Sequence, residues 1–194
     1  MNNSFTIHRC VATVAGMHRR QSGFSLHDLV VASAVASILT LGAVATAGML
    51  QDARMTASVN QLLGDLSLAR SEAIKRNTNI ALCKSADGVR CTREGPWQNG
   101  WIVFADEDNN HEINESETVL RVQQALDGNL KLRYGETGTY YYVRYNSSGE
   151  AWPGATFSFC DQRGAGKAKA IIVYWSGRPR VSVKTSEGKA LSCI

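Results

Sequence analysis

A long uncharged segment near the N-terminus limits what this chain can fold into. Residues 29–50 contain no charged side chain and are mostly apolar. About 20 such residues in a helix cross the hydrocarbon core of a bilayer. Arg19 and Arg20 lie upstream of the segment. Because positive charge favours the cytoplasmic side, the sequence predicts a single-pass helix with the bulk of the chain outside the cytoplasm.

The residues before this segment predict proteolytic processing. A secretory signal is cleaved after its apolar region, whereas here the small-aromatic junction Gly23-Phe24 comes before it. This arrangement resembles the class III leader of type IV prepilins and type II secretion pseudopilins. The resemblance implies that a prepilin peptidase removes residues 1–23, cutting after Gly23, and methylates the new amino group of Phe24. The apolar helix would then remain on the mature chain.

Asp28 is the fifth residue after that junction, where the family usually has Glu. A carboxylate near the end of a membrane helix is costly unless it is paired. One interpretation is that Asp28 serves assembly, neutralising the Phe24 amine of its own or a neighbouring subunit inside a filament. The alternative is that it only caps the helix, since an acid in the first turn interacts favourably with the macrodipole.

The helix is predicted to continue beyond the apolar segment. Apolar residues recur at helical spacing between residues 51 and 77, and charged residues such as Asp65 and Arg70 take the other positions. No proline interrupts Phe24 to Lys75. We therefore expect one helix of about 50 residues, with residues 24–50 in the membrane and residues 51–77 packed on a soluble domain.

Residues 78–194 are predicted to form that domain from short strands. Eight runs rich in aromatic and β-branched residues are separated by turn residues. These runs are residues 79–83, 100–104, 118–123, 130–134, 140–145, 156–160, 170–175 and 180–183. The predicted fold class is α+β: a pilin-like lollipop, with the long helix packed on two small antiparallel sheets.

Two segments sharpen the family resemblance. Residues 60–77 and 100–104, with the acidic run behind the latter, look like the GspH/FimT group of minor pilins. The resemblance implies an inner-membrane protein with a periplasmic domain, assembled with other pilins or pseudopilins. No nucleophile elbow, phosphate-cradling glycine loop or zinc-binding His-Glu-x-x-His motif occurs in the sequence. The chain is therefore predicted to be no enzyme and to use no cofactor.

The cysteines agree with an oxidising compartment. Cys10 lies in the leader, and four cysteines remain after it. Three pairings are open; Cys83–Cys91 and Cys160–Cys193 are favoured, because the first closes a hairpin-sized loop and the second ties down the C-terminus. Zinc is disfavoured, because no Cys-x-x-Cys occurs and His111 is the only histidine after the apolar segment.

The charge of the domain is unevenly distributed. Residues 94–127 hold eight acids and one basic residue, whereas residues 161–194 hold seven basic residues and two acids. A basic region is the electrostatic mark of a polyanion binder, although solvated surface lysines and arginines would look the same. Within it lies Gly177-Arg178-Pro179-Arg180, which resembles the Gly-Arg-x-Arg signature of the DNA-binding FimT group. Gly177 and Pro179 predict a constrained loop that projects both guanidiniums.

Two functional hypotheses follow. The first is a FimT-like minor pilin that binds DNA without sequence preference, in transformation or pilus biogenesis. Its contacts would be Arg178 and Arg180, with further candidates at Gly177, Lys184, Lys167 and Lys169. The second is pseudopilin H of a type II secretion system, acting at the filament tip through protein contacts alone.

The acidic region contains a spacing that resembles a calcium loop. Acids or amides occupy positions 1, 3, 5, 9 and 12 of an EF-hand pattern running from Asp106 to Glu117, but His111 takes the place of the required glycine. An exposed acidic turn is favoured, and no metal site is predicted. The four tryptophans, Trp97, Trp101, Trp152 and Trp175, are predicted to be core or packing residues, although Trp152 precedes Pro153 and is compatible with exposure.

Overall fold

The computed structural model describes residues 25–193, except for residues 127, 137 and 139 and the side chains of residues 38–47. The chain divides into two compact units, residues 1–45 and 46–194. Helix α1 (Leu26–Arg76) is a single element of 51 residues, as the periodicity predicts. A search of the described residues finds no helical stretch with the length and hydropathy of a membrane span.

The second half of α1 supplies one side of the core. Its buried residues recur every three or four positions, as expected for an amphipathic helix; they are Met55, Val59, Leu62, Leu66, Ala69 and Ala73. Asp65 departs from the prediction that charged residues take the solvent side, because it is buried in the same stripe. Its Oδ2 accepts a hydrogen bond from Trp101 Nε1 at 2.9 Å, and burial raises its pKa.

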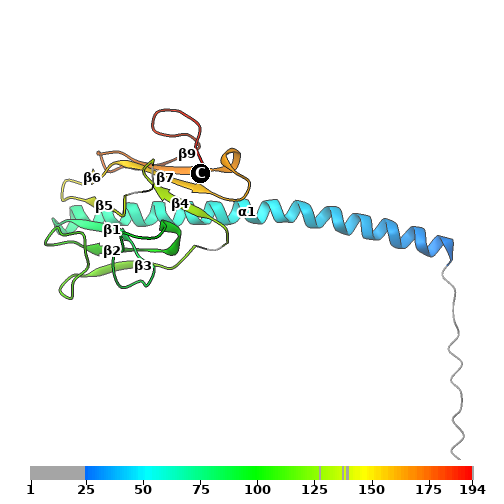
Figure 1. The fold of residues 1–194 in the computed structure, drawn as a ribbon, viewed down its shortest axis with the longest axis horizontal. Coiled ribbons are helices and arrows are strands. Elements are labelled where there is room, and N and C mark those ends of the chain that lie inside the picture. Colours follow the sequence, from blue (N-terminus) through cyan, green and yellow to red (C-terminus); the bar gives the residue numbers. More distant parts are fainter. Residues whose placement is uncertain (1–24, 127, 137, 139, 194) are drawn as a thin grey trace, which may run out of the picture. The chain divides into compact units, whose positions relative to one another are not determined.

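Two antiparallel sheets cover this face of the helix (Figure 1). The five-stranded sheet has the order β3-β2-β1-β5-β6, and the four-stranded sheet has the order β4-β7-β8-β9. The strands of the first are β1 (Ile80–Lys84), β2 (Trp101–Ala105), β3 (Val119–Gln123), β5 (Tyr142–Tyr145) and β6 (Ala151–Trp152). Those of the second are β4 (Lys131–Tyr134), β7 (Ala155–Cys160), β8 (Lys169–Val173) and β9 (Pro179–Ser182).

One apolar cluster joins the helix to both sheets, so residues 46–194 enclose their own core. The eight predicted strands are all present, and no strand end is shifted by more than two residues; the two-residue shifts are at the start of β5 and at the end of β8. Strand β6 was not predicted, because its two residues are too short to show a period. The α+β fold with two small antiparallel sheets is confirmed.

Both favoured disulfides are present in the structure. Cys83 is bonded to Cys91, and Cys160 is bonded to Cys193. The first closes the loop after β1, and the second fixes the C-terminal segment to the end of β7.

Candidate nucleic-acid interface

The connection between β8 and β9, together with the first two residues of β9, is named here the arginine turn (residues 174–180). Its tight geometry depends on Gly177, which has a φ of 71° and donates its amide to the Tyr174 carbonyl at 2.8 Å. A Cβ at this position would lie 1.8 Å from the carbonyl oxygen of Gly149. Any residue with a side chain would clash with the Gly149 backbone, so only glycine fits at this position. Gly177 therefore holds the arginine turn against the turn that follows β5.

Two further contacts anchor the arginine turn. The backbone amide of Ala151, in β6, donates to the Trp175 carbonyl at 3.0 Å, which ties the two sheets together. From the helix, Arg70 Nε donates to the Gly149 carbonyl at 3.0 Å. Sequence periodicity placed Arg70 among the helix's polar positions and gave no sign of this role. Its partner is 79 residues away in the chain, so no local pattern marks it.

Arg178 and Arg180 are both exposed. Arg180 donates from Nη2 to the Tyr174 hydroxyl at 3.3 Å, and its guanidinium carbon lies 5.5 Å from the centre of that ring. None of the ion pairs formed among the described residues involves Arg178 or Arg180. These guanidiniums thus keep donors available for an external anion.

The loop predicted to project both arginines is shorter than expected. Strand β9 begins at Pro179, and Arg180 lies within it, opposite Ile172 of β8. Only Arg178 belongs to the irregular part of the turn. The difference arises because Pro179 can start an edge strand, where its missing N–H is not needed.

The structure separates the predicted lysines into two places. Lys169 starts β8 and donates to Thr56 Oγ1 at 2.8 Å, and Lys167 lies near enough to Asp52 to lower the pKa of that carboxyl, after the larger effect of Arg163. Both lysines therefore lie beside the early part of the packed helix, whereas the arginine turn follows the opposite end of β8.

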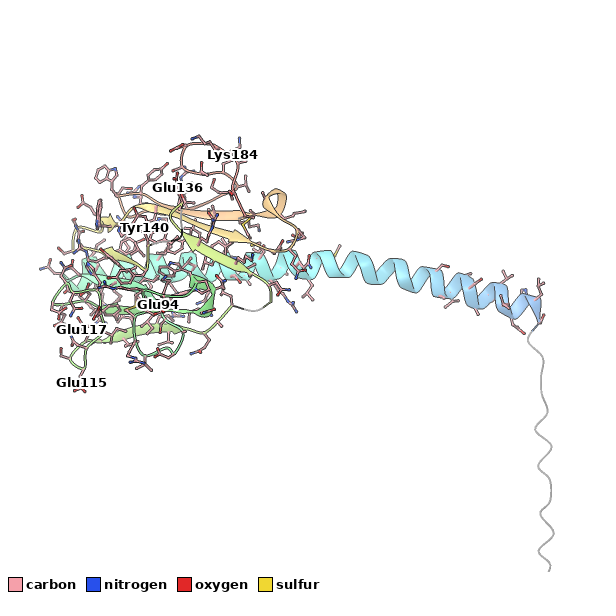
Figure 2. The ribbon with its side chains drawn as sticks, viewed as in Figure 1. Glu94, Glu115, Glu117, Glu136, Tyr140 and Lys184 are labelled. Carbon is pink, nitrogen blue, oxygen red and sulfur yellow. A yellow bond between two sulfur atoms is a disulfide. The ribbon has the colours of Figure 1, made fainter. Side chains whose placement is uncertain are left out.

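Lys184 is exposed and belongs to the C-terminal segment (Figure 2). It forms an isolated antiparallel bridge with Ala190. The Tyr174 hydroxyl contacts the Ser186 carbonyl at 3.5 Å, so this segment lies beside the arginine turn. The contact is made by Ser186, whereas Lys184 follows Ser182, which pairs with Ala170 near the start of β8.

The tryptophans divide into two pairs. Trp97 and Trp101 are buried, as predicted, whereas Trp152 and Trp175 are 63% and 70% exposed. The prediction of a packing role is wrong for Trp175, because β8 ends at Val173 and leaves the next residues on the surface. Exposed indoles beside arginines are a feature that the sequence alone did not reveal.

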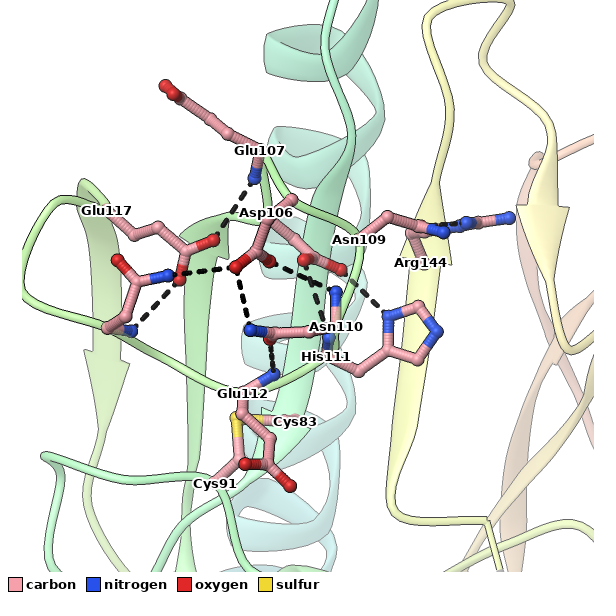
Figure 3. A network of polar contacts seen from close by, with 12 residues as sticks. Cys83, Cys91, Asp106, Glu107, Asn109, Asn110, His111, Glu112, Glu117 and Arg144 are labelled. Carbon is pink, nitrogen blue, oxygen red and sulfur yellow. Dashed lines mark hydrogen bonds and ion pairs between the residues drawn. A yellow bond between two sulfur atoms is a disulfide. The ribbon is translucent and has the colours of Figure 1, made fainter.

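Residues 106–117, named here the acidic loop, form the second candidate site (Figure 3). Asp106 is fully buried, which corrects the expectation of an entirely exposed turn. Its Oδ2 lies 2.8 Å from His111 Nδ1, and its Oδ1 accepts the His111 amide at 3.4 Å. His111, in the position that calls for glycine in a calcium loop, has a φ of 64°. Histidine therefore takes the left-handed conformation there.

Three carboxylates of the acidic loop lie close together. Oxygens of Asp106, Asp108 and Glu117 lie within 4.8 Å of one another, so these are the residues that could hold a metal. Both Glu117 oxygens already accept backbone hydrogen bonds, from Glu107 at 3.1 Å and Asn114 at 3.1 Å. Burial, with repulsion from Asp108 and Asp106, raises the pKa of Glu117 despite these bonds. Many polar groups of the acidic loop are thus hydrogen-bonded within the loop itself.

The processing junction, Gly23 and Phe24, lies outside the described residues. Asp28 is described, and its Oδ2 accepts the backbone amide of Ser25 at 3.1 Å, while Ser25 Oγ accepts the His27 amide at 3.3 Å. Asp28 thus bonds to the N-cap amide as in a capping box, while the Ser25 hydroxyl bonds to the amide of the second helical residue. Asp28 therefore caps α1, and its role in assembly remains a prediction.

Comparison with known proteins places the fold in a family. The model of the Type II transport protein GspH family matches residues 58–177. It ends at Gly177, so the match does not include Arg178 or Arg180. No curated protein matches the chain.

Two crystal structures of one minor pilin show the same fold at low identity. The type IV minor pilin FimU of Pseudomonas aeruginosa PAO1 is 18% identical, with a TM-score of 0.51, over 72% of this chain and 95% of FimU. A second crystal form of FimU gives 17% identity and a TM-score of 0.50, over 72% of this chain and 99% of FimU. The minor pseudopilin EpsH of the Vibrio cholerae type 2 secretion system is 16% identical, with a TM-score of 0.47, over 66% of this chain and 96% of EpsH. Since the GspH family model matches well over half of this chain's residues, the chain belongs to the GspH family of minor pilins and pseudopilins.

Proposed function

We propose that this protein is a FimT-like minor type IV pilin that binds DNA without sequence preference through its arginine turn. The observation that carries the proposal is the exposure of Arg178 and Arg180 on a rigid connection, with no ion pair to either among the described residues. Guanidiniums fork onto phosphate oxygens, and a preformed turn reduces the ordering that binding requires.

The remaining parts of the proposal follow from the sequence. Residues 1–23 are a leader that a prepilin peptidase removes after Gly23, and Phe24 is then methylated. Residues 24–50 anchor the protein in the inner membrane and later pack in the filament, with Asp28 beside the Phe24 amine. Residues 51–77 pack on the periplasmic domain, residues 78–194. The partners are other pilins and DNA.

The experiment is a salt-titrated DNA-binding measurement on residues 46–194. Among the described residues, every buried core residue lies in this fragment, from Met55 onward, as do both disulfides, so it is a self-contained folding unit. We expect Arg178→Ala/Arg180→Ala to weaken duplex binding at least about tenfold at low salt. The slope of log affinity against log salt should fall by about 2, since each phosphate contact contributes about 1.

A matched control comes from the same basic stretch of sequence. Lys167→Ala/Lys169→Ala removes the same charge but lies beside Asp52 and Thr56, away from the arginine turn. It should change affinity by less than about threefold, the small loss expected for distant, screened charges. Equal losses in the two double variants would show that net charge alone attracts DNA. Unchanged binding in the arginine variant would favour the pseudopilin H alternative, in which the domain contacts only other pseudopilins.

A further inference from the structure

Two tryptophans form an exposed aromatic surface beside the arginine turn. Trp152 and Trp175 are 63% and 70% exposed, whereas Trp97 and Trp101 are at most 1% exposed. An indole offers a large apolar area that a fold usually buries, as it does for Trp97 and Trp101. Exposed large aromatic groups that lie together are a mark of a binding surface.

The backbone brings the two indoles to one place. Trp152 ends β6, the edge strand of the first sheet, and Ala151 before it donates its amide to the Trp175 carbonyl at 3.0 Å. Both tryptophans line a shallow depression of about 280 Å³, and both line a second one of about 250 Å³. The second also contains Tyr174. The indoles therefore border the same concave surface, at the junction of the two sheets.

Cationic groups lie in and beside this surface. Arg144 pairs with Trp152 across β5 and β6 and lines the first depression. Its Nη1 donates to Asn109 Oδ1 of the acidic loop, and its buried Nε has no hydrogen-bond partner among the described residues. Arg178 and Arg180 follow Trp175 in the chain. The acid lining the first depression, Glu150, already accepts hydrogen bonds from the Asn146 amide group and the Ser148 hydroxyl.

This composition distinguishes between two forms of nucleic acid. Phosphates alone need only guanidiniums, and duplex DNA keeps its bases stacked inside the helix. Unpaired bases stack on aromatic side chains, and each such contact contributes about 1–3 kcal/mol whatever the base. Exposed indoles next to arginines fit a strand that presents both phosphates and unstacked bases.

We propose that Trp152 and Trp175 form a stacking platform for unpaired bases, so that the domain binds single-stranded DNA more tightly than duplex DNA. This rests on the proposed function, because the arginine turn holds the phosphates of the same strand. The charge of Arg144, Arg178 and Arg180 favours a polyanion over a protein as the occupant, since a protein surface would have to supply matching acids.

The test compares a 20-nucleotide thymidine strand with a duplex of equal length, on fragment 46–194. Wild-type protein should bind the single strand about tenfold more tightly, which corresponds to one to two stacked bases. Trp152→Ala/Trp175→Ala should abolish this preference, because its loss of single-strand affinity should exceed any loss of duplex affinity by about tenfold. Trp152→Phe/Trp175→Phe should restore part of it, because phenylalanine keeps an aromatic face.

Fluorescence supplies a second measurement that a loss of folding would not mimic. Of the four tryptophans, all of them described, Trp152 and Trp175 are exposed and the other two are buried. The single strand should therefore quench part of the emission, and the quenching should disappear in the alanine variant. Equal affinity of the wild type for both DNA forms, or equal losses for both in the tryptophan variant, would overturn the platform.

The arginine variant keeps the two proposals separable. If Arg178→Ala/Arg180→Ala leaves duplex affinity intact, the proposed function fails, whatever the tryptophans do. If it weakens both DNA forms while Trp152→Ala/Trp175→Ala changes neither, DNA binding stands and the platform fails. That last outcome would assign the two indoles to a contact with another protein subunit.

Discussion

The acidic loop and the arginine turn are the two charged regions of the domain, and they differ in how their charges are satisfied. In the acidic loop, Asp106 and Glu117 accept hydrogen bonds from the loop's own backbone and from His111. In the arginine turn, Arg178 and Arg180 form no ion pair with any described residue. The first region uses its charge to fix its own conformation. The second has its conformation fixed by Gly177 and Arg70, and its charge stays available.

Arg144 connects the two regions. It donates to Asn109 in the acidic loop and lines the depression bordered by Trp152 and Trp175. The acidic loop therefore helps to position a cation of the candidate interface. A region rich in charge need not be a binding site; unsatisfied polar groups on a rigid support are the better indicator.

The largest effect is expected at Gly177, which anchors the arginine turn. Gly177→Ala places a Cβ 1.8 Å from the Gly149 carbonyl oxygen, and we expect a loss of about 3 kcal/mol in the free energy of unfolding, from strain and overpacking together. Urea denaturation of fragment 46–194 measures it. Gly188→Ala is the matched control, since Gly188 has a similar φ of 80° and open space around it; it should lose about 1 kcal/mol. Equal losses would mean that the close approach does not anchor the turn.

A smaller effect is expected in the acidic loop. Asp106→Ala removes the partner of the His111 amide and ring nitrogen, and should reduce the free energy of unfolding by about 2 kcal/mol because these partly buried groups are left without it. Asp108→Ala is the control, because Asp108 is exposed and its hydrogen bonds to Asn110 and Asn114 are exposed as well, so its loss should cost no more than about 1 kcal/mol. Chemical denaturation of both variants measures the difference in their free energies of unfolding. A variant of Asp106 as stable as that of Asp108 would remove the structural role assigned to this loop.

The smallest effect is expected from calcium. We predict that about 1 mM Ca²⁺, enough for weak extracellular sites, shifts the thermal midpoint of fragment 46–194 by less than about 1 °C. The reason is that Asp106 and Glu117 already have partners within the loop. Differential scanning calorimetry with and without chelator measures the shift. A rise of several degrees in the thermal midpoint that Glu117→Gln abolishes would show that the acidic loop also needs a ligand. The two regions would then not differ in how their charges are satisfied.

Much of the fold was predictable because it depends on local periodicity. The spacing of Val59, Leu62 and Leu66 predicts the buried stripe of α1, and the eight strand runs all form strands. The disulfides followed from the small number of pairings. Asp65 was misplaced, since its burial depends on Trp101, which is 36 residues away. Strand β6 was missed because only its neighbours in the sheet define it.

The candidate site was predictable only in part. Gly177, Arg178 and Arg180 stand out as a motif, so they were found from the chain alone. The sequence also grouped Lys167 and Lys169 with this motif, but that grouping was wrong. These lysines lie near the start of β8, whereas the motif follows the end of that strand. The participation of Arg70, Arg144 and Trp152 was invisible, because each comes from a different element.

By itself, the sequence determined the elements: a long helix, short strands, the cysteine pairs and a glycine-arginine motif. Each of these arises from spacing within a few residues, which local geometry converts directly into structure. Only the tertiary structure decided which charges are satisfied. Burial and the contacts between elements depend on residues far apart in the chain: Arg70 bonds to Gly149 and Arg144 bonds to Asn109, while the guanidiniums and indoles around the arginine turn are left exposed.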